Sequence, residues 1–192
     1  MIQSRPVFAD STKVTLHAFA DESRRGDNYF IAAALVGPRD LSPLRKLLKG
    51  MRKPGQRELH FKKEDKTRRK EIVSRLVGSG AAVQIYVASC VRGEEVARRR
   101  CLVQLVEDLV DFGVGRLVLD SREVRDDADI QLFQRTLGAH RHHDLVYEHQ
   151  DSCWEPLLWV ADAVAWCYGA GGDWQRRVTP LVGKVIDLRD VP

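Results

Sequence analysis

Apolar residues fall into short runs that are bounded by glycine, proline or charged residues. Runs of four to eleven residues that alternate, or that are apolar throughout, predict strands, because successive strand side chains point to opposite faces. Residues 14–20 are apolar at nearly every position, which predicts a central strand covered on both faces. A short polar link to the next run suggests a hairpin. The predicted strands are residues 14–20, 29–36, 81–91, 116–119 and 145–148, and residues 182–188 fit either a last strand or a docked tail.

Apolar residues at intervals of three and four predict the helices. Ser152 and Glu155 have the spacing of a capping box, which predicts the start of the last long helix. The resulting order is strand, strand, helical insertion, strand, helix, strand, helix, strand, helix, and it predicts an α/β fold. The predicted helices are residues 41–51, a segment that includes Ile72 and Leu76, and residues 94–112, 130–137 and 157–168.

Length and composition fit one domain over residues 1–192 with a substantial core, since 44% of the residues are hydrophobic. Within it we expect a loose tail at 1–12, the helical insertion at 38–80 and a C-terminal extension at 169–192. The net charge of +4 favours polyanionic partners.

The four cysteines form no C-x-x-C pair and no signal peptide precedes them, so buried thiols are favoured over disulfides. No apolar run reaches 18 residues, so we expect no membrane span and a cytoplasmic protein.

Three aspartates occupy unusual positions. Asp21 and Asp120 each follow an apolar strand, and Asp162 lies in the middle of a helix on the face that carries Leu158 and Trp166. A lone buried carboxylate is costly, whereas several carboxylates can share a divalent cation such as Mg²⁺. The alternatives are turn residues for the first two and a core ion pair with an arginine for Asp162. Adjacent parallel strands and a helix packed on them could bring all three together.

At this point the motifs resemble a known family. They are Phe19 to Ser23 followed by Tyr29 to Ala34, then Glu58 to Phe61, Leu119 to Arg122, and Glu155 to Trp166. In this order they are similar to the motifs of the domain-of-unknown-function 3800 family, over roughly residues 15–170. That family resembles members of the RNase H-like superfamily. The fold so implied runs three antiparallel strands, a helix, and then alternating parallel strands and helices, which is the order deduced above apart from the insertion.

The resemblance implies a nuclease or phosphodiesterase that uses Mg²⁺ or Mn²⁺ and acts on nucleic acid. Asp21 would bridge two ions, Asp120 would bind one of them and Asp162 the other. Glu58 is the family's glutamate, but it precedes the third strand, so Glu94 or Glu95 at the start of the long helix remains an alternative. Possible auxiliary residues are Glu22, His60 and Arg122.

Basic residues near the Glu58 motif could follow a phosphate backbone, or they could form a solvated helix face. They are Lys62, Lys63, Arg68 and Arg69. The rival to a nuclease is a protein without turnover, a nucleic-acid-binding or defence or mobile-element accessory protein on a nuclease-like fold. A phosphodiesterase for small nucleotides is a third possibility.

Two further groups favour structural interpretations. His140, His142 and His143 lack additional ligands at zinc spacing, so an exposed turn is favoured. The four tryptophans between Trp154 and Trp174 are better explained by core packing than by base stacking.

Overall fold

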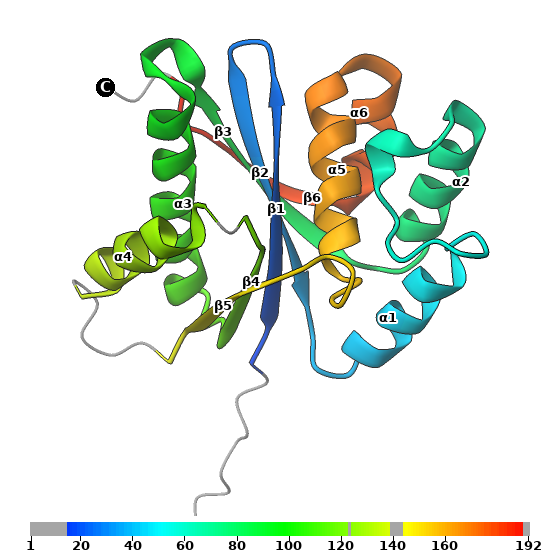
Figure 1. Cartoon of the computed structure of the whole chain (residues 1–192), viewed down its shortest axis with the longest axis horizontal. Helices are drawn as coiled ribbons and strands as arrows, with labels where there is room; N and C mark the ends of the chain where they lie inside the picture. Colours follow the sequence, from blue (N-terminus) through cyan, green and yellow to red (C-terminus); the bar gives the residue numbers. More distant parts are fainter. Residues whose placement is uncertain (1–14, 123, 139–143, 190–192) are drawn as a thin grey trace, which may run out of the picture.

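A computed structural model describes residues 15–122, 124–138 and 144–189. The expected tail at residues 1–12 and the cluster of His140, His142 and His143 lie outside the described residues. A six-stranded sheet runs through the centre of the molecule between two layers of helices (Figure 1).

The sheet is mixed and has the strand order β5-β4-β1-β2-β3-β6. β1, β2 and β3 form antiparallel pairs, β4 lies parallel to β1, and β5 lies parallel to β4. The predicted order of antiparallel strands followed by parallel ones is therefore confirmed. β6 pairs parallel with β3, which decides that the last apolar segment is a strand. The strands are β1 (His17–Arg25), β2 (Asn28–Val36), β3 (Ala82–Ser89), β4 (Arg116–Asp120), β5 (Val146–Gln150) and β6 (Val182–Asp187).

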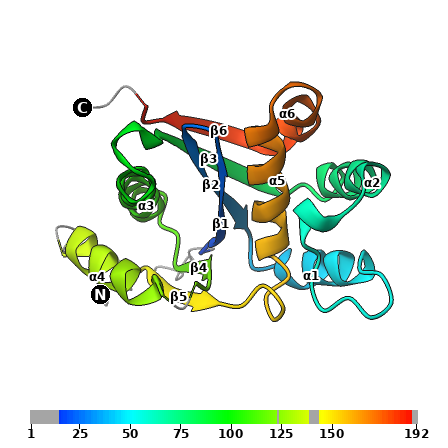
Figure 2. The same cartoon turned by 45° about the horizontal axis from the view of Figure 1, so that its top comes forward.

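The helices are divided between the two faces of the sheet (Figure 2). One face carries α3 (Glu94–Asp111) and α4 (Asp126–Leu137). The other carries α1 (Leu41–Gly50), α2 (Lys66–Val77), α5 (Leu158–Ala170) and α6 (Gly172–Val178), with short 3₁₀ turns at η1 (Phe61–Lys63), η2 (Cys90–Arg92) and η3 (Thr179–Leu181). α1, η1 and α2 form the predicted insertion between β2 and β3. None of the described helices is long and apolar enough to cross a bilayer.

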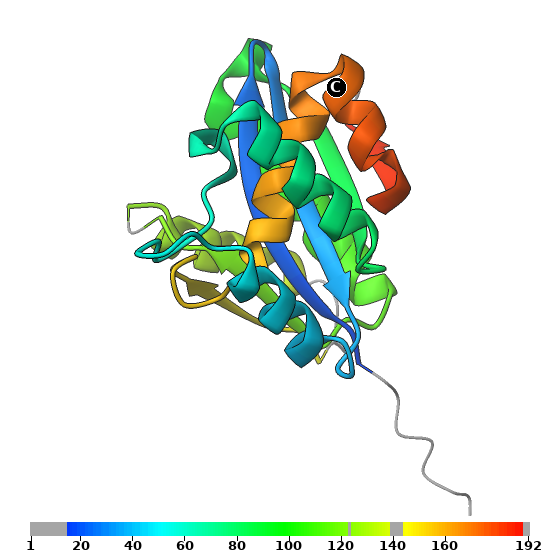
Figure 3. The same cartoon turned by 90° about the vertical axis from the view of Figure 1, so that its right-hand side faces the viewer.

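Small residues let α5 pack closely on the sheet. In β2, Ala32, Ala33 and Ala34 are fully buried. Ala32 and Ala34 belong to the core cluster that contains α5, whereas Ala33 belongs to the cluster that contains α3. Figure 3 shows α5 lying across the strands, with the insertion helices beside it. Sheet alternation therefore supplies two separate cores from one strand.

Two local predictions were wrong. β1 continues beyond Ala20 to Arg25, because backbone pairing with β2 extends from Asp21 opposite Ala32 to Arg25 opposite Asn28. Asp21 thus lies inside the strand rather than after it. The capping box is also absent: the N-cap of α5 is Leu157, with no side-chain cap. The Ser152 hydroxyl donates to Glu58 instead, and tertiary contacts thus replaced the local motif.

Candidate functional site

A cavity of about 110 Å³ lies on the α5 side of the sheet. All four carboxylates proposed from the sequence line it, together with the three proposed auxiliary residues. Its walls come from β1, β4, α5, the insertion and the loop before α5. The lining residues are Asp21, Glu22, Glu58, Leu59, His60, Asp120, Arg122, Ser152, Leu158, Trp159 and Asp162.

Asp21 and Asp120 share a face because of strand alternation. Phe19 and Val118 belong to the core on the α5 side, so Asp21 and Asp120, two residues further along each strand, lie on that same side. The strands are parallel neighbours, and Ala20 pairs with Leu119 immediately before the two aspartates. The two carboxylates therefore stand side by side on adjacent strands.

Asp162 reaches the site from the first half of α5, near the strands. Its Oδ2 accepts a hydrogen bond of 2.9 Å from the Phe61 backbone N–H. His60 Nδ1 lies 3.7 Å from the same oxygen. Asp162 is 19% exposed at its side chain, so it faces the cavity rather than the interior. One oxygen of Asp162 thus fastens the insertion to α5.

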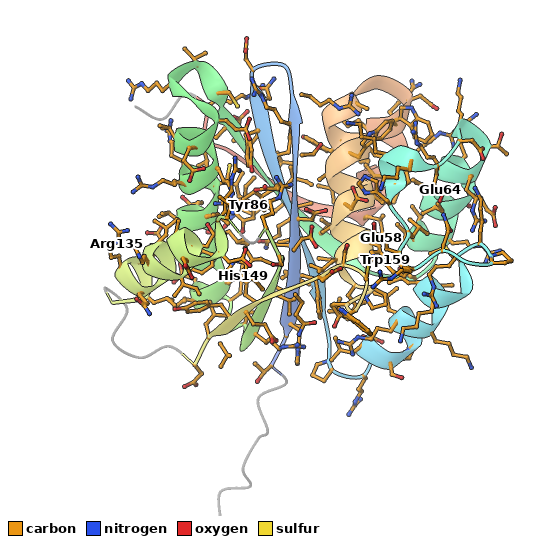
Figure 4. The ribbon with its side chains drawn as sticks, viewed as in Figure 1. Glu58, Glu64, Tyr86, Arg135, His149 and Trp159 are labelled. Carbon is orange, nitrogen blue, oxygen red and sulfur yellow. The ribbon has the colours of Figure 1, made fainter. Side chains whose placement is uncertain are left out.

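Glu58 reaches the cavity because the insertion folds back over the sheet. Figure 4 shows Glu58 beside Trp159, at the first turn of α5. The Ser152 hydroxyl donates to Glu58 Oε2 at 2.5 Å, and this bond joins the insertion to the loop that follows β5. Neither alternative, Glu94 nor Glu95, is among the residues that line the cavity. Glu94 instead accepts a 2.8 Å hydrogen bond from Arg24.

The loop after β5 contributes residues that the sequence analysis did not single out. One ligand atom each from Glu58, Asp151 and Cys153 lie within 4.8 Å of one another. Across the described ranges, no other group of three potential metal ligands has this mutual spacing, so the three aspartates stand further apart. Asp151 directly follows β5, which is a parallel neighbour of β4. This position is the sequence signal that could have indicated Asp151 and Cys153, because the carboxyl ends of neighbouring parallel strands commonly form sites.

Burial and nearby negative charges raise the pKa of Asp21 and Asp120. The pKa of Asp21 lies well above its ordinary value, first because of burial and then because Asp162 and Asp120 are close. Burial also raises the pKa of Asp120 to about 6, although Arg122 opposes the shift. The adjacent carboxylate of Asp162 raises the pKa of His60. Raised pKa values of this kind are expected for buried carboxylates that the fold holds close together in spite of their mutual repulsion.

Glu22 is among the residues that line the cavity, but its carboxylate pairs with Arg98 of α3 on the opposite face of the sheet from Asp21. Arg98 donates to Glu22 at 2.9 Å and forms a two-bond pair with Asp129 on α4. Tyr29 also donates to Glu22. His149 Nε2 lies 3.2 Å from Asp129, and Figure 4 shows it on the α4 side of the sheet. This buried ion network supports β1 from behind the cavity.

The basic residues of the insertion fall into two kinds. Lys62 and Lys63 are exposed, but Arg68 and Arg69 are half-buried. Arg68 donates to the Met51 carbonyl, and Arg69 donates to the Phe61 and Lys62 carbonyls. The two arginines therefore brace the insertion, which leaves the two lysines as the better candidates for contacts with phosphate.

The tryptophans also differ in their surroundings. Trp159 is buried, and Trp166 packs against Trp174 with ring centroids 5.5 Å apart. Core packing accounts for these three. Trp154, in contrast, is 76% exposed, so the expectation of core packing is wrong for this residue. It lies in the loop that carries Ser152.

The donor set suits a hard divalent cation. Asp21, Asp120, Asp162 and Glu58 offer carboxylate oxygens, the ligands that Mg²⁺ and Mn²⁺ favour. A cation would also offset the repulsion that raises the pKa of Asp21. Asp151 and Cys153 lie next to Glu58, and the Cys153 sulfur is a softer donor. By spacing, the group that fits one divalent metal ion is Glu58, Asp151 and Cys153. The four carboxylates of the cavity fit Mg²⁺ or Mn²⁺ by the chemistry of their oxygens.

Comparison with solved structures identifies the fold. The chain is similar to a chain of the PCNA:RNase HII complex from Archaeoglobus fulgidus, with a TM-score of 0.52 and 20% identity. The similarity covers 78% of this chain and 70% of that chain. No protein-family profile and no curated protein sequence matches. The architecture is therefore RNase H-like, as the sequence predicted.

Proposed function

We propose that this protein is a divalent-metal-dependent nuclease or phosphodiesterase that acts on nucleic acid. The observation that supports this proposal most strongly is the cavity in which Asp21, Glu58, Asp120 and Asp162 meet from separate segments of the chain. The similarity to the RNase HII complex supports it at the level of the fold. A role confined to binding would not require so many carboxylates to face a phosphate ligand, because each would repel it.

A bound divalent cation supplies charge stabilisation and a water of lowered pKa to phosphodiester cleavage. The residues that would hold it are Asp21, Asp120 and Asp162, with Glu58 at the side of the insertion. His60 and Arg122 line the same cavity and can donate to a phosphate oxygen. The Asp162 contact with Phe61 and the Ser152 contact with Glu58 fix the insertion against α5, which orients Glu58 and His60.

The finer assignments belong to the same proposal. The motif order supports membership of the domain-of-unknown-function 3800 family, and the RNase H-like architecture agrees with it. All four cysteines are unpaired, which agrees with a reducing compartment such as the cytoplasm. A single domain over residues 1–192 agrees with one sheet that receives strands from β1 to β6.

The test is Asp120→Asn, which keeps the shape of the side chain and removes its charge. Cleavage of labelled RNA, DNA and hybrid substrates in Mg²⁺ or Mn²⁺ should fall by about a thousandfold or more, because metal catalysis supplies several kcal/mol. Binding should persist, since a charge that repels phosphate has been removed. Melting temperature is measured on the same preparations.

The matched control is Asp111→Asn, an exposed aspartate at the end of α3 on the opposite face of the sheet. It should leave cleavage unchanged. Full specific activity in folded Asp120→Asn protein would contradict the catalytic proposal. Binding without cleavage by the wild-type protein in either metal would favour the accessory-protein alternative.

A further inference from the structure

The loop between β5 and α5 holds Trp154 beside the carboxylate cavity. A tryptophan ring offers one of the largest apolar surfaces of any side chain, and its exposure forgoes roughly 2–3 kcal/mol of burial. Trp154 is nevertheless 76% exposed. Its neighbour Ser152, two residues earlier, lines the cavity. Two residues of chain span at most about 7 Å, so the backbone of Trp154 lies within about 7 Å of a residue that lines the cavity.

The backbone on both sides of Trp154 is firmly held. The Trp154 backbone N–H donates to the Asp151 carbonyl at 2.8 Å, and the Cys153 N–H donates to the Asp151 carboxylate at 2.7 Å. The Ser152 carbonyl accepts a 2.8 Å bond from the Trp159 indole. The ring is therefore presented by a fixed loop.

The following residue, Glu155, completes this anchoring. It is 4% exposed and forms two hydrogen bonds with Arg45 of α1, at 2.9 and 2.6 Å. Since the loop is tied to α1 and α5, the backbone position of Trp154 is set before any ligand binds. Such preorganisation reduces the entropy lost on binding.

A positive charge lies near the same loop. Arg57 is exposed and precedes Glu58 in the insertion. Glu58 accepts the hydrogen bond from Ser152 of this loop, which keeps Arg57 next to the loop. An aromatic face and an arginine next to a carboxylate cavity are the two elements that bind a single-stranded nucleotide, the first by stacking on the base and the second by pairing with the phosphate.

From these contacts we infer that Trp154 stacks on an unpaired base next to the cleaved phosphate, and that Arg57 contacts the adjoining phosphate. This inference rests on the proposed function, which supplies both the nucleic-acid ligand and the cleaved phosphate, whereas stacking of the base on Trp154 needs no cleavage. Bases inside a duplex are stacked on each other and hide their faces, so the substrate strand is single or locally unpaired at this position.

The experiment measures anisotropy of labelled oligothymidylate, oligouridylate and a blunt DNA duplex, in EDTA so that no cleavage is needed. Trp154→Ala should weaken binding of both single strands by about 5- to 100-fold, the range for one stacked base. Trp154→Phe should retain most of the affinity. Arg57→Gln should reduce the salt dependence by roughly 0.7 in the log–log slope.

The matched control is Phe112→Ala, which removes another exposed aromatic at the end of α3, on the far face of the sheet. It should leave affinity unchanged. Equal affinity of wild-type and Trp154→Ala protein for both single strands would overturn the inference. If Trp154→Ala changed only the oligomeric state seen by sedimentation, the ring would be assigned to a contact between proteins. Cleavage assays in Mg²⁺ test the proposed nuclease function, whereas anisotropy in EDTA tests stacking on Trp154. The failure of one proposal is therefore distinguishable from the failure of the other.

Discussion

Asp21 and Glu22 are adjacent in the chain, yet they lie in opposite electrostatic environments. Asp21 faces other carboxylates, whereas Glu22 meets Arg98 and Arg122 at 2.9 and 2.7 Å. The alternation of a strand is enough to separate them, because each step reverses the face. A shift of one residue in the pairing with β2 would exchange the two environments. The site thus depends on the register of a single strand.

The raised pKa of Asp120 predicts a pH-dependent cost to stability. The unfolded carboxyl ionises near 3.8 and the folded one at about 6, so the metal-free protein loses stability as pH rises through this interval. Relative to wild type, Asp120→Asn should gain about 1–2 kcal/mol between pH 4 and 7, a value discounted for partial exposure. Urea unfolding in EDTA at several pH values measures this difference. A constant difference across the range would contradict it.

At the scale of elements, Arg98 joins three parts of the fold. It lies on α3, is 4% exposed, and pairs with Glu22 of β1 and with Asp129 of α4. Burial of these three charges is tolerable only because each has partners. The network holds α3 and α4 against the strand that carries Asp21.

Arg98→Ala should therefore destabilise the protein by about 3–5 kcal/mol, since it leaves two buried carboxylates without their main partner. Arg99→Ala, at the next and exposed position of α3, should change stability by less than about 0.5 kcal/mol. Chemical unfolding of both variants gives the comparison. Equal stability of the two would show that the network adds nothing to the fold.

In the insertion, the residues proposed to bind nucleic acid differ from those that hold the insertion in its conformation. Lys62→Gln combined with Lys63→Gln should weaken nucleic-acid binding, with the melting temperature unchanged. For duplex, the log–log slope of affinity against salt should fall by up to about 1.8.

Arg69→Gln should lower the melting temperature, because two carbonyls of the insertion lose their donor. Binding across a salt series and thermal melts test both. A melting temperature unaffected by Arg69→Gln would remove the bracing role.

At the scale of the whole molecule, a shared cation should stabilise the fold. A ligand present at ten times its dissociation constant adds about 1.4 kcal/mol when it binds only the folded state. For a chain of this length, that corresponds to a rise of about 3–6 °C in melting temperature. Thermal melts in EDTA and in millimolar Mn²⁺ should show this rise in the wild type and little of it in Asp120→Asn. Equal rises in the two proteins would place the cation elsewhere.

The order of elements was predictable from the sequence because it depends on local periodicity. Period-two and continuous apolar runs marked the strands, and spacings of three and four marked the helices. The apolar character of both faces of the first strand indicated its central place. Asp21, Asp120 and Asp162 stood out against their apolar neighbours. The resemblance of the motifs to a known family implied the RNase H-like fold and added Glu58.

Contacts between distant segments decided the rest. Pairing with β2 extended β1 past Asp21, and pairing with β3 made residues 182–187 a strand. Ser152 donates to Glu58, 94 residues away, instead of capping its own helix. Local spacing could not reveal the exposure of Trp154 or the burial of Arg98, because both depend on which segments pack around them. Hydrophobic pattern is a property of neighbours in the chain, whereas a site is a property of neighbours in space.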